Sequence, residues 1–357
     1  MDHPVDLRVN ERSLRIFCAS TFERLGVATS DAVLWADAII ETSLRGVDSH
    51  GILVLPMYLE MLEAGGIKAN AALEVIKDEG PTLLLDGGQG IGAVIAHRAM
   101  NLALDRAVEF GLSFVAVRNS NHFGSAGYYA AKSLERDMIG GSLTNAGPAV
   151  AAWGGKSKVI GSNAMAVAVP AESEFPIVLD LAIGASAAAK IFLAGERGER
   201  IPTDWMLDRN GQPTDDPSQL FAGGILQSFG KHKGAGLGLI VDVLTGVISG
   251  GLFSTAVRGF GPDRSVSQGV CHSFWGLDVR RFMDVGQFKR RVDEMIRNVK
   301  ASETRDAFER VYLPGEKGFL TRQDRERNGI PLWTRLVKDL KELSKRLSVD
   351  SPFPAVD

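Results

Sequence analysis

Apolar positions in the first part of the chain repeat at the spacing of an amphipathic helix. This pattern predicts one helical face made of Leu14, Phe17, Cys18, Phe22 and Leu25. A second helix is expected from Ser30–Asp31 to about Leu44, where Gly46 would stop it. Pro56 predicts the opening of a short third helix over residues 57–63. The N-terminal part of the chain is therefore expected to be helical.

From about residue 72 the pattern changes to short apolar runs between glycines, which are typical of strands. The runs predict strands over Thr82–Leu85, Leu112–Val117, Ile139–Leu143, Ala164–Val169 and Ile177–Leu181. One long helix over Ala93–Phe110 separates the first two. The polar, turn-rich stretch Arg197–Pro217 is expected to be an ordered excursion.

Helical spacing returns after about residue 282. Asp284 is expected to cap a helix that runs to about Lys300, and Pro331 to begin another. The last helix would carry on one face Leu332, Leu336, Val337, Leu340, Leu343 and Leu347. The whole pattern predicts a helical domain of residues 1–71 plus 283–357, around an inserted α/β domain of residues 72–282.

The most apolar run, residues 236–253, contains Asp242 and several glycines, so we expect a buried helix and not a membrane span.

The composition is that of a globular enzyme, with 45% hydrophobic and 23% charged residues among 357. A net charge of −3 without a basic block argues against nucleic acid as a partner. Two cysteines cannot form a disulfide framework or a cysteine-only zinc site. The first eight residues lack signal-peptide features, so the cytosol is expected.

Two of the six histidines lie in polar turns that contain glycine. His50 stands between Ser49 and Gly51 after a predicted helix, and His122 lies in Asn119–Gly124 after a predicted strand. Such histidines either cap turns or exchange protons, because the imidazole pKa is about 6.5. Their occurrence as a pair favours a catalytic site.

Two glycine clusters compete as phosphate sites. Gly88–Ala93 fits the G-x-G-x-x-G/A dinucleotide pattern after a strand, but the next strand ends in Arg118 and offers no acid for the ribose. An arginine there would suit NADP, so the missing acid does not exclude a Rossmann site. The alternative, that these glycines only allow tight packing before the helix, is favoured. Gly230–Gly236 combines glycines with Lys231 and Lys233 before an apolar helix, which favours anion binding over an ordinary basic turn.

Asp180 ends a predicted strand and is followed by a run of small residues. A carboxylate in that position is well placed either to contact a ligand or to cap the helix expected through Lys190.

Seven motifs in the same order resemble the malate/L-lactate dehydrogenase family, whose members have a sulfolactate dehydrogenase-like fold and include ureidoglycolate dehydrogenase, diketogulonate reductase and piperideine-carboxylate reductase. The resemblance covers nearly the whole chain. It rests on Arg45–Gly51, Val117–Gly124 with Gly127–Tyr129, Gly161–Asn163 before Ala164–Pro170, Leu179–Ala182, Ile201–Pro202 with Asp204–Trp205, Lys233–Gly234 with Gly236, and Pro314–Glu316.

The resemblance implies an α+β fold in which a mostly antiparallel sheet binds the nicotinamide cofactor, and so not a Rossmann domain. It also implies a homodimer, with substrate and nicotinamide meeting between the domains. By residue-for-residue carry-over, the expected cofactor contacts are His122, Asn145, Ala146, Gly161, Ser162, Asn163, Asp180, Leu181, Ala182, Lys233, Gly234 and Glu316.

We therefore predict an NAD(P)-dependent oxidoreductase that acts on a 2-hydroxy or 2-keto acid or a related hydroxyl or imine substrate. His50 would be the acid/base, Ser49 would orient it, His122 or Asp180 would assist, and Tyr58 would position the substrate. No metal is expected, because these histidines show no third ligand at close spacing.

One departure from the family leaves the substrate open. Four residues after the motif histidine the family usually has an arginine suited to a carboxylate, and this chain has Val54. Arg45, Arg118 or Lys156 would have to replace it, or the substrate lacks that carboxylate. A cyclic imine reductase of the same family is the alternative; a non-catalytic ligand sensor and a metal-dependent hydrolase that uses the histidines are alternatives from other classes.

Overall fold

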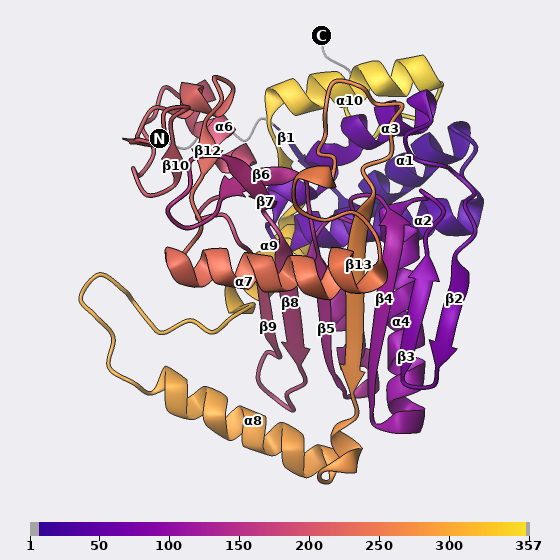
Figure 1. The fold of residues 1–357 in the computed structure, drawn as a ribbon, viewed down its shortest axis with the longest axis vertical. Coiled ribbons are helices and arrows are strands. Elements are labelled where there is room, and N and C mark those ends of the chain that lie inside the picture. The colour runs from indigo at the N-terminus through magenta and orange to yellow at the C-terminus, as the bar shows by residue number, and fades with distance from the viewer. Residues whose placement is uncertain (1–6, 355–357) are drawn as a thin grey trace.

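A large mixed sheet of seven strands organises the molecule, which is a computed structural model describing residues 7–354 (Figure 1). Its strand order is β2-β3-β4-β13-β5-β8-β9. The bounds are β2 Glu74–Glu79, β3 Thr82–Asp86, β4 Leu112–Ser120, β13 Val270–Leu277, β5 Ile139–Thr144, β8 Ala164–Val169 and β9 Ile177–Ala182. Five of the six neighbouring pairs are antiparallel. The predicted strands and the mostly antiparallel sheet are confirmed.

The parallel pair is β3–β4, joined by helix α4 (Gly92–Phe110). Helix α4 covers one face of the sheet, and α7 (His232–Asp242) with its π-helical extension Val243–Val247 crosses the other face (Figure 1). Strand β13 lies in the middle of the sheet between these layers, and most of its residues are buried. A strand covered on both faces shows no polar alternation, so the sequence pattern did not reveal it.

Helices from both ends of the chain pack together beyond one end of the large sheet (Figure 1). They are α1 Glu11–Arg24, α2 Thr29–Leu44, α3 Leu55–Ala64, α9 Glu316–Asn328 and α10 Thr334–Leu347. Strand β1 (Leu7–Val9) pairs with β14 (Ile330–Leu332) and ties the two termini together. The helix expected from Pro331 starts three residues later, because Pro331 lies in β14 opposite Arg8. Proline is tolerated there since β14 is part of a two-stranded sheet.

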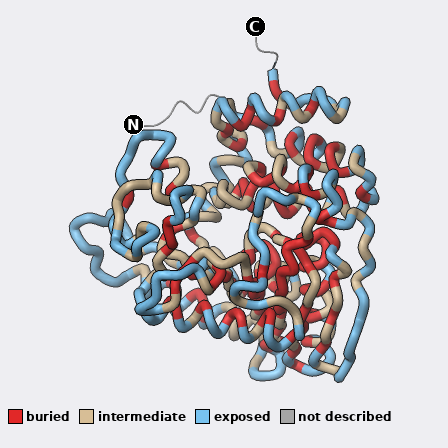
Figure 2. Tube along the Cα trace, turned by 45° about the horizontal axis from the view of Figure 1, so that its top comes forward, coloured by how far each residue is buried: buried red, intermediate tan, exposed pale blue. Residues whose placement is uncertain are grey.

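The core runs without a break from these helices into the large sheet, with Trp35, Phe123 and Phe274 among its buried aromatic residues. Figure 2 shows buried segments gathered along the sheet and helices, and exposed segments at the periphery. Helix α8 (Val285–Lys300) lies at the opposite end of the sheet from α10 (Figure 1). Asp284 accepts a hydrogen bond from the Gln287 N–H, which confirms the predicted cap. The two-domain division of the chain stays a prediction.

A second, five-stranded sheet has its own small core. Its order is β11-β10-β12-β6-β7, with bounds β11 Pro213–Thr214, β10 Met206–Leu207, β12 Ile225–Leu226, β6 Pro148–Ala151 and β7 Lys158–Gly161. The excursion Arg197–Pro217 supplies two of these short strands, so it is ordered as predicted. Helix α6 (Ala188–Glu196) packs on this sheet through Ile191.

The expectation that the apolar run 236–253 is buried was wrong in part. It forms α7 and its extension, but Leu239, Ile240, Val243, Val247 and Ile248 are each about half exposed. No helix within residues 7–354 is both long and apolar enough to cross a membrane. The first six residues, which carry most of the signal-peptide argument, lie outside the described residues.

Candidate active site

His50 lies in a short 3₁₀ turn, Asp48–His50, between α2 and α3. The Ser49 hydroxyl and His50 Nδ1 are 2.8 Å apart, within hydrogen-bond distance. Arg325 of α9 donates from both guanidinium nitrogens to the Asp48 carboxylate, one of them at 3.0 Å. Burial lowers the pKa of His50, and the nearby Asp180 charge opposes this shift. The ring is therefore held in place and favours its neutral form.

His122 lies in the turn after β4, and this turn is fixed by its own side chains. Asn121 donates to the carbonyls of Gln89 and Gly90 and accepts the Gln268 N–H. The His122 N–H donates to the Gln268 side-chain oxygen at 2.8 Å. The turn is thus locked to the Gly88–Gly92 segment on one side and to residue 268 on the other.

The hydrogen bonds of His122 define its tautomer. Nδ1 lies 2.6 Å from the Tyr58 hydroxyl and accepts the Gly124 N–H at 3.4 Å. A backbone N–H can only donate, so Nδ1 is an acceptor, the Tyr58 hydroxyl donates to it, and the ring proton sits on Nε2. Burial, together with His50 and His272, holds the pKa of His122 well below its usual value. His122 is therefore a neutral hydrogen-bond donor.

The two imidazoles face each other at a centroid distance of 5.4 Å, with Phe260 packed on His122 at 5.1 Å. The Nε2 atoms of both rings have no hydrogen-bond partner anywhere in the described part of the chain. Four predicted site residues, His50, Ser49, Tyr58 and His122, are thus brought together from different segments.

Asp180 lies on β9 beside a cleft of about 400 Å³. Its Oδ2 accepts hydrogen bonds from the Ser125 hydroxyl at 2.6 Å and from the Gly127 N–H at 3.0 Å. A Cβ at Gly127 would lie 2.6 Å from that oxygen, so glycine is required for this approach. Ala187 is the N-cap residue of α6, so the alternative that Asp180 caps this helix was wrong.

The Gly88–Ala93 segment is a packing turn. A Cβ at Gly92 would lie 2.1 Å from the Asn121 carbonyl oxygen, and one at Gly90 would lie 2.7 Å from Ala71 Cβ. Because the space of the missing side chains is filled by protein, the segment supports the His122 turn, and the packing interpretation is confirmed. Only one parallel pair exists in the large sheet, so it is not a Rossmann sheet.

The predicted cofactor contacts near α7 use their side chains within the protein. Asn145 bonds to Asp242, to the Leu252 carbonyl and to the Cys271 N–H. The Asn163 side chain accepts the Ala146 N–H and donates to Gly238. Ser162, of the segment Gly161–Asn163, accepts the Gly184 N–H at 3.3 Å.

Other predicted contacts lie at the surface or in ion pairs. Lys231 and Lys233 are exposed at the start of α7, where a Cβ at Gly234 would lie 2.0 Å from the Phe229 carbonyl oxygen. Leu181 and Ala182 continue β9 beside the cleft, and Glu316 is buried in ion pairs with Lys300 and Arg310. Exposed lysines at a helix start and a cleft beside Asp180 fit a phosphate-bearing cofactor. All these contacts stay predictions.

Sequence patterns missed several residues that build the site. Phe260 and Gln268 lie in a loop without periodicity, and Arg325 lies in a charged helix whose many arginines look alike. Residues 7–354 contain no group of three His, Cys, Asp or Glu side chains that could hold a metal ion, so a metal-dependent hydrolase has no ligand set there.

The structure thus combines a mostly antiparallel sheet that is not a Rossmann sheet, a pair of facing histidines and a cleft beside an aspartate. The chain matches the family described as malate/L-lactate dehydrogenase over residues 9–341, and it belongs to that family. It is 38% identical to a malate dehydrogenase of Pyrococcus horikoshii, over 96% of both chains.

Solved structures agree with this assignment. The fold is similar to that of the sulfolactate dehydrogenase from Methanocaldococcus jannaschii, with a TM-score of 0.90, 32% identity and coverage of 96% and 98% of the two chains. It is also similar to a Δ1-piperideine-2-carboxylate reductase from Pseudomonas syringae pv. tomato, with a TM-score of 0.84, 26% identity and coverage of 94% and 99%. The predicted family, fold and enzyme class, an NAD(P)-dependent dehydrogenase, are thereby confirmed.

Proposed function

We propose that this enzyme oxidises a 2-hydroxy acid, or reduces the matching 2-keto acid, with His50 as the group that takes and returns the proton. The observation that supports this is the stacked pair of imidazoles with Nε2 atoms left free of protein partners. The nicotinamide supplies or accepts the hydride when it is bound. The relatives named as malate and sulfolactate dehydrogenases support this substrate class.

The two histidines have different roles in this proposal, because their electrostatic environments differ. His50 lies within electrostatic reach of Asp180, which stabilises its protonated form, so it can cycle between neutral and charged states. His122 is held neutral with its proton on Nε2, so it donates a hydrogen bond to the substrate oxygen and polarises it. Tyr58 is buried and its hydroxyl is committed to His122, so it positions the substrate through that ring.

The substrate's carboxylate is not bound at position 54. Val54 is 5% exposed and belongs to the hydrophobic core, so it offers no polar contact there. Arg118 is ion-paired with Asp86 at 3.0 Å and is therefore engaged elsewhere. This favours a substrate with an apolar or neutral group near Val54.

The reductase of cyclic imines among the structural relatives supports the second hypothesis, reduction of a C=N bond in a cyclic imino acid.

The test is a screen of 2-keto acids, 2-hydroxy acids and cyclic imines with NAD(H) and NADP(H), followed at the absorbance of the reduced nicotinamide. We expect His50→Ala to lower turnover by roughly 10²–10⁴ while cofactor affinity stays near that of the unaltered enzyme. His122→Ala should lower both turnover and cofactor affinity. Unchanged turnover in His50→Ala would remove His50 from the mechanism, and cofactor binding without turnover of any substrate would favour a ligand sensor.

We further propose a cytosolic homodimer that buries the apolar side of α7 and its extension. This side is formed by four apolar residues that are each about half exposed, namely Leu239, Ile240, Val243 and Val247. They are adjacent in sequence or about one helical turn apart, so they share one side of the helix. A contiguous apolar helix face of this kind marks an interface. Ile240→Asp with Val243→Asp should convert the dimer to a monomer in sedimentation analysis, whereas Ile16→Asp, at an exposed position on α1, should not. A monomeric parent protein would refute the dimer.

A further inference from the structure

Arg45, at the C-terminal end of α2, places its guanidinium in a cleft without a hydrogen-bond or ion-pair partner among the described residues. It lines the cleft of about 400 Å³ together with Asp180, Tyr128, Gly315 and Gly318. Within residues 7–354 its side chain makes no hydrogen bond and no ion pair, and its guanidinium lies over the Phe319 ring at 4.6 Å. Burial lowers its pKa. A partly buried charge without a counter-ion is costly, so a role outside the protein's own contacts is expected.

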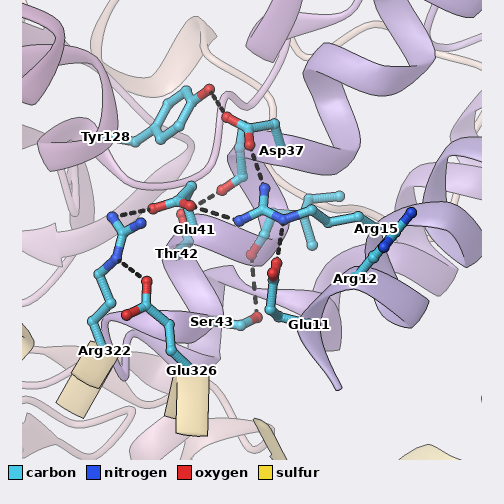
Figure 3. Close-up of polar contacts among 12 residues, drawn as sticks. Glu11, Arg12, Arg15, Asp37, Glu41, Thr42, Ser43, Tyr128, Arg322 and Glu326 are labelled. Carbon is cyan, nitrogen blue, oxygen red and sulfur yellow. Dashed lines mark hydrogen bonds and ion pairs between the residues drawn. The ribbon is translucent and has the colours of Figure 1, made fainter. Parts of the chain in front are cut away.

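Two other arginines, Arg15 and Arg322, are held by acidic side chains in a network that Figure 3 shows. Arg15 contacts Glu11, Asp37 and Glu41, while Arg322 contacts Glu41 and Glu326. Glu41 lies one helical turn before Arg45 and could have been its partner. Its two oxygens are already taken, one by Arg15 at 2.6 Å and the other by Arg322 at 2.7 Å. The network thus satisfies its own members and leaves Arg45 free.

The first turn of α9 makes room for the guanidinium. A Cβ at Gly318 would lie 3.6 Å from Arg45 Nε, which is an ordinary van der Waals contact, so this turn of the helix lies directly beside the arginine. The start of a helix carries partial positive charge, which adds to the charge of Arg45. Asp180 attracts Arg45 but forms no ion pair with it, and its Oδ1 accepts no hydrogen bond within the described residues.

We propose that Arg45 binds an oxyanion group of a ligand in this cleft, either a carboxylate of the substrate or a phosphate of the cofactor. A guanidinium donates two parallel hydrogen bonds to such a group. Asp180 would repel a second negative charge, so the ligand offers one anionic group to Arg45 and a hydrogen-bond donor to Asp180. A carboxylate bound here would replace the contact that Val54 cannot make. This inference rests on the proposed function.

The test compares Arg45→Met, Arg45→Lys and a control, Arg136→Met. Arg136 is also partly exposed, but it is ion-paired with Asp105 and lies away from this cleft. Binding is measured by fluorescence for NADH, nicotinamide mononucleotide and nicotinamide riboside, and for oxamate in the presence of NADH. We expect Arg45→Met to weaken one anionic probe by roughly 10- to 100-fold, with partial recovery in Arg45→Lys and no change in the control.

The probes distinguish the two sources of the oxyanion. Weaker mononucleotide binding with unchanged riboside binding assigns a cofactor phosphate to Arg45. Weaker oxamate binding with unchanged NADH binding assigns the substrate carboxylate. If Arg45→Met binds all four probes within about twofold of the parent, which is the scale of an exposed ion pair, the proposal is overturned.

A failure of the proposed function gives a different result in these binding measurements from a failure of the Arg45 proposal. A parent protein that binds neither NADH nor NADPH contradicts the cofactor assignment. In that case malonate and inorganic phosphate are tested by thermal shift. Stabilisation of the parent and not of Arg45→Met would keep the anion site, and equal shifts for both would refute it.

Discussion

Two glycine-rich turns, Gly88–Gly92 and Gly230–Gly236, differ in how much of their surface is free of protein contacts. In the first, the places where side chains would stand are filled by Ala71 and by the backbone of the His122 turn. In the second, the backbone of Phe229 blocks a Cβ at Gly234, but Lys231 and Lys233 are exposed, and a Cβ at Gly236 would meet nothing within 4 Å. The first turn therefore supports the loop that carries His122, and the second leaves lysine charges exposed, where we propose that a ligand binds.

The same contrast separates two sides of the site. On the closed side, around His122, polar groups bond to one another: Asn121 to the glycine turn, and His272 to Ser120 and Thr144. On the open side, Arg45 and the α7 lysines lack such partners. Changes on the closed side should cost stability, whereas changes on the open side should cost binding or shift the chemistry.

The largest effect is expected from Gly92→Ala on the closed side. Its Cβ would lie 2.1 Å from a backbone oxygen, so the turn or the start of α4 must move. We expect a loss of roughly 3 kcal/mol in the free energy of unfolding, measured by urea denaturation. Gly261→Ala is the control, because a Cβ there meets nothing within 4 Å. A Gly92→Ala protein as stable as the control would show that the turn is not tightly packed.

The next effect is the dependence of stability on pH from His272. Burial lowers the pKa of His272 to about 3, whereas the unfolded chain protonates near 6.5. Its contribution to stability is present above pH 6.5 and is lost as the pH falls toward 3. Between pH 8 and pH 5 we expect a loss of at most about 2 kcal/mol. His272→Gln should flatten this slope, and an unchanged slope would assign the dependence to other groups.

Lys233→Ala should have a smaller effect, on the open side. It removes one exposed charge aimed at phosphate, so we expect cofactor affinity to fall by about 3- to 10-fold, and by less at high salt. The free energy of unfolding should not change in Lys233→Ala.

Gly90→Ala should have the reverse effect, lowering the free energy of unfolding while the folded protein binds cofactor normally. Loss of cofactor binding in well-folded Gly90→Ala, with Lys233→Ala unaffected, would reverse the roles that we assign to the two turns.

Sequence patterns identified β3, β4, β5, β8 and β9 of the large sheet, because each is a short, mostly apolar run. They missed the edge strand β2, whose residues are mostly charged and all exposed. They missed β13, since a strand buried on both faces with His272 and Ser273 inside lacks both alternation and uniform apolarity. They paired His50 and His122 from their polar turns, whereas Ser49 and Tyr58 joined the predicted site only through the family motifs. Arg45 was named as one of three candidates, and the structure distinguishes it from Arg118 because Arg118 is ion-paired with Asp86.

The smallest effect is expected from Asp180→Asn. The Asp180 charge raises the pKa of His50 against the effect of burial, so its removal lowers that pKa further. His50 must be neutral to accept a proton from a 2-hydroxy acid, so the acid limb of kcat/KM should lie below pH 6.5 in the parent. In Asp180→Asn it should move to still lower pH by roughly one unit or less, while reduction of the keto acid at pH 7 slows. Asparagine can still accept the bonds from Ser125 and Gly127, so the geometry is kept. Asp105→Asn serves as the control, because Asp105 pairs with Arg136 away from the cleft. An acid limb that stays in place would show that Asp180 does not tune His50 and that its role is confined to the cleft it shares with Arg45.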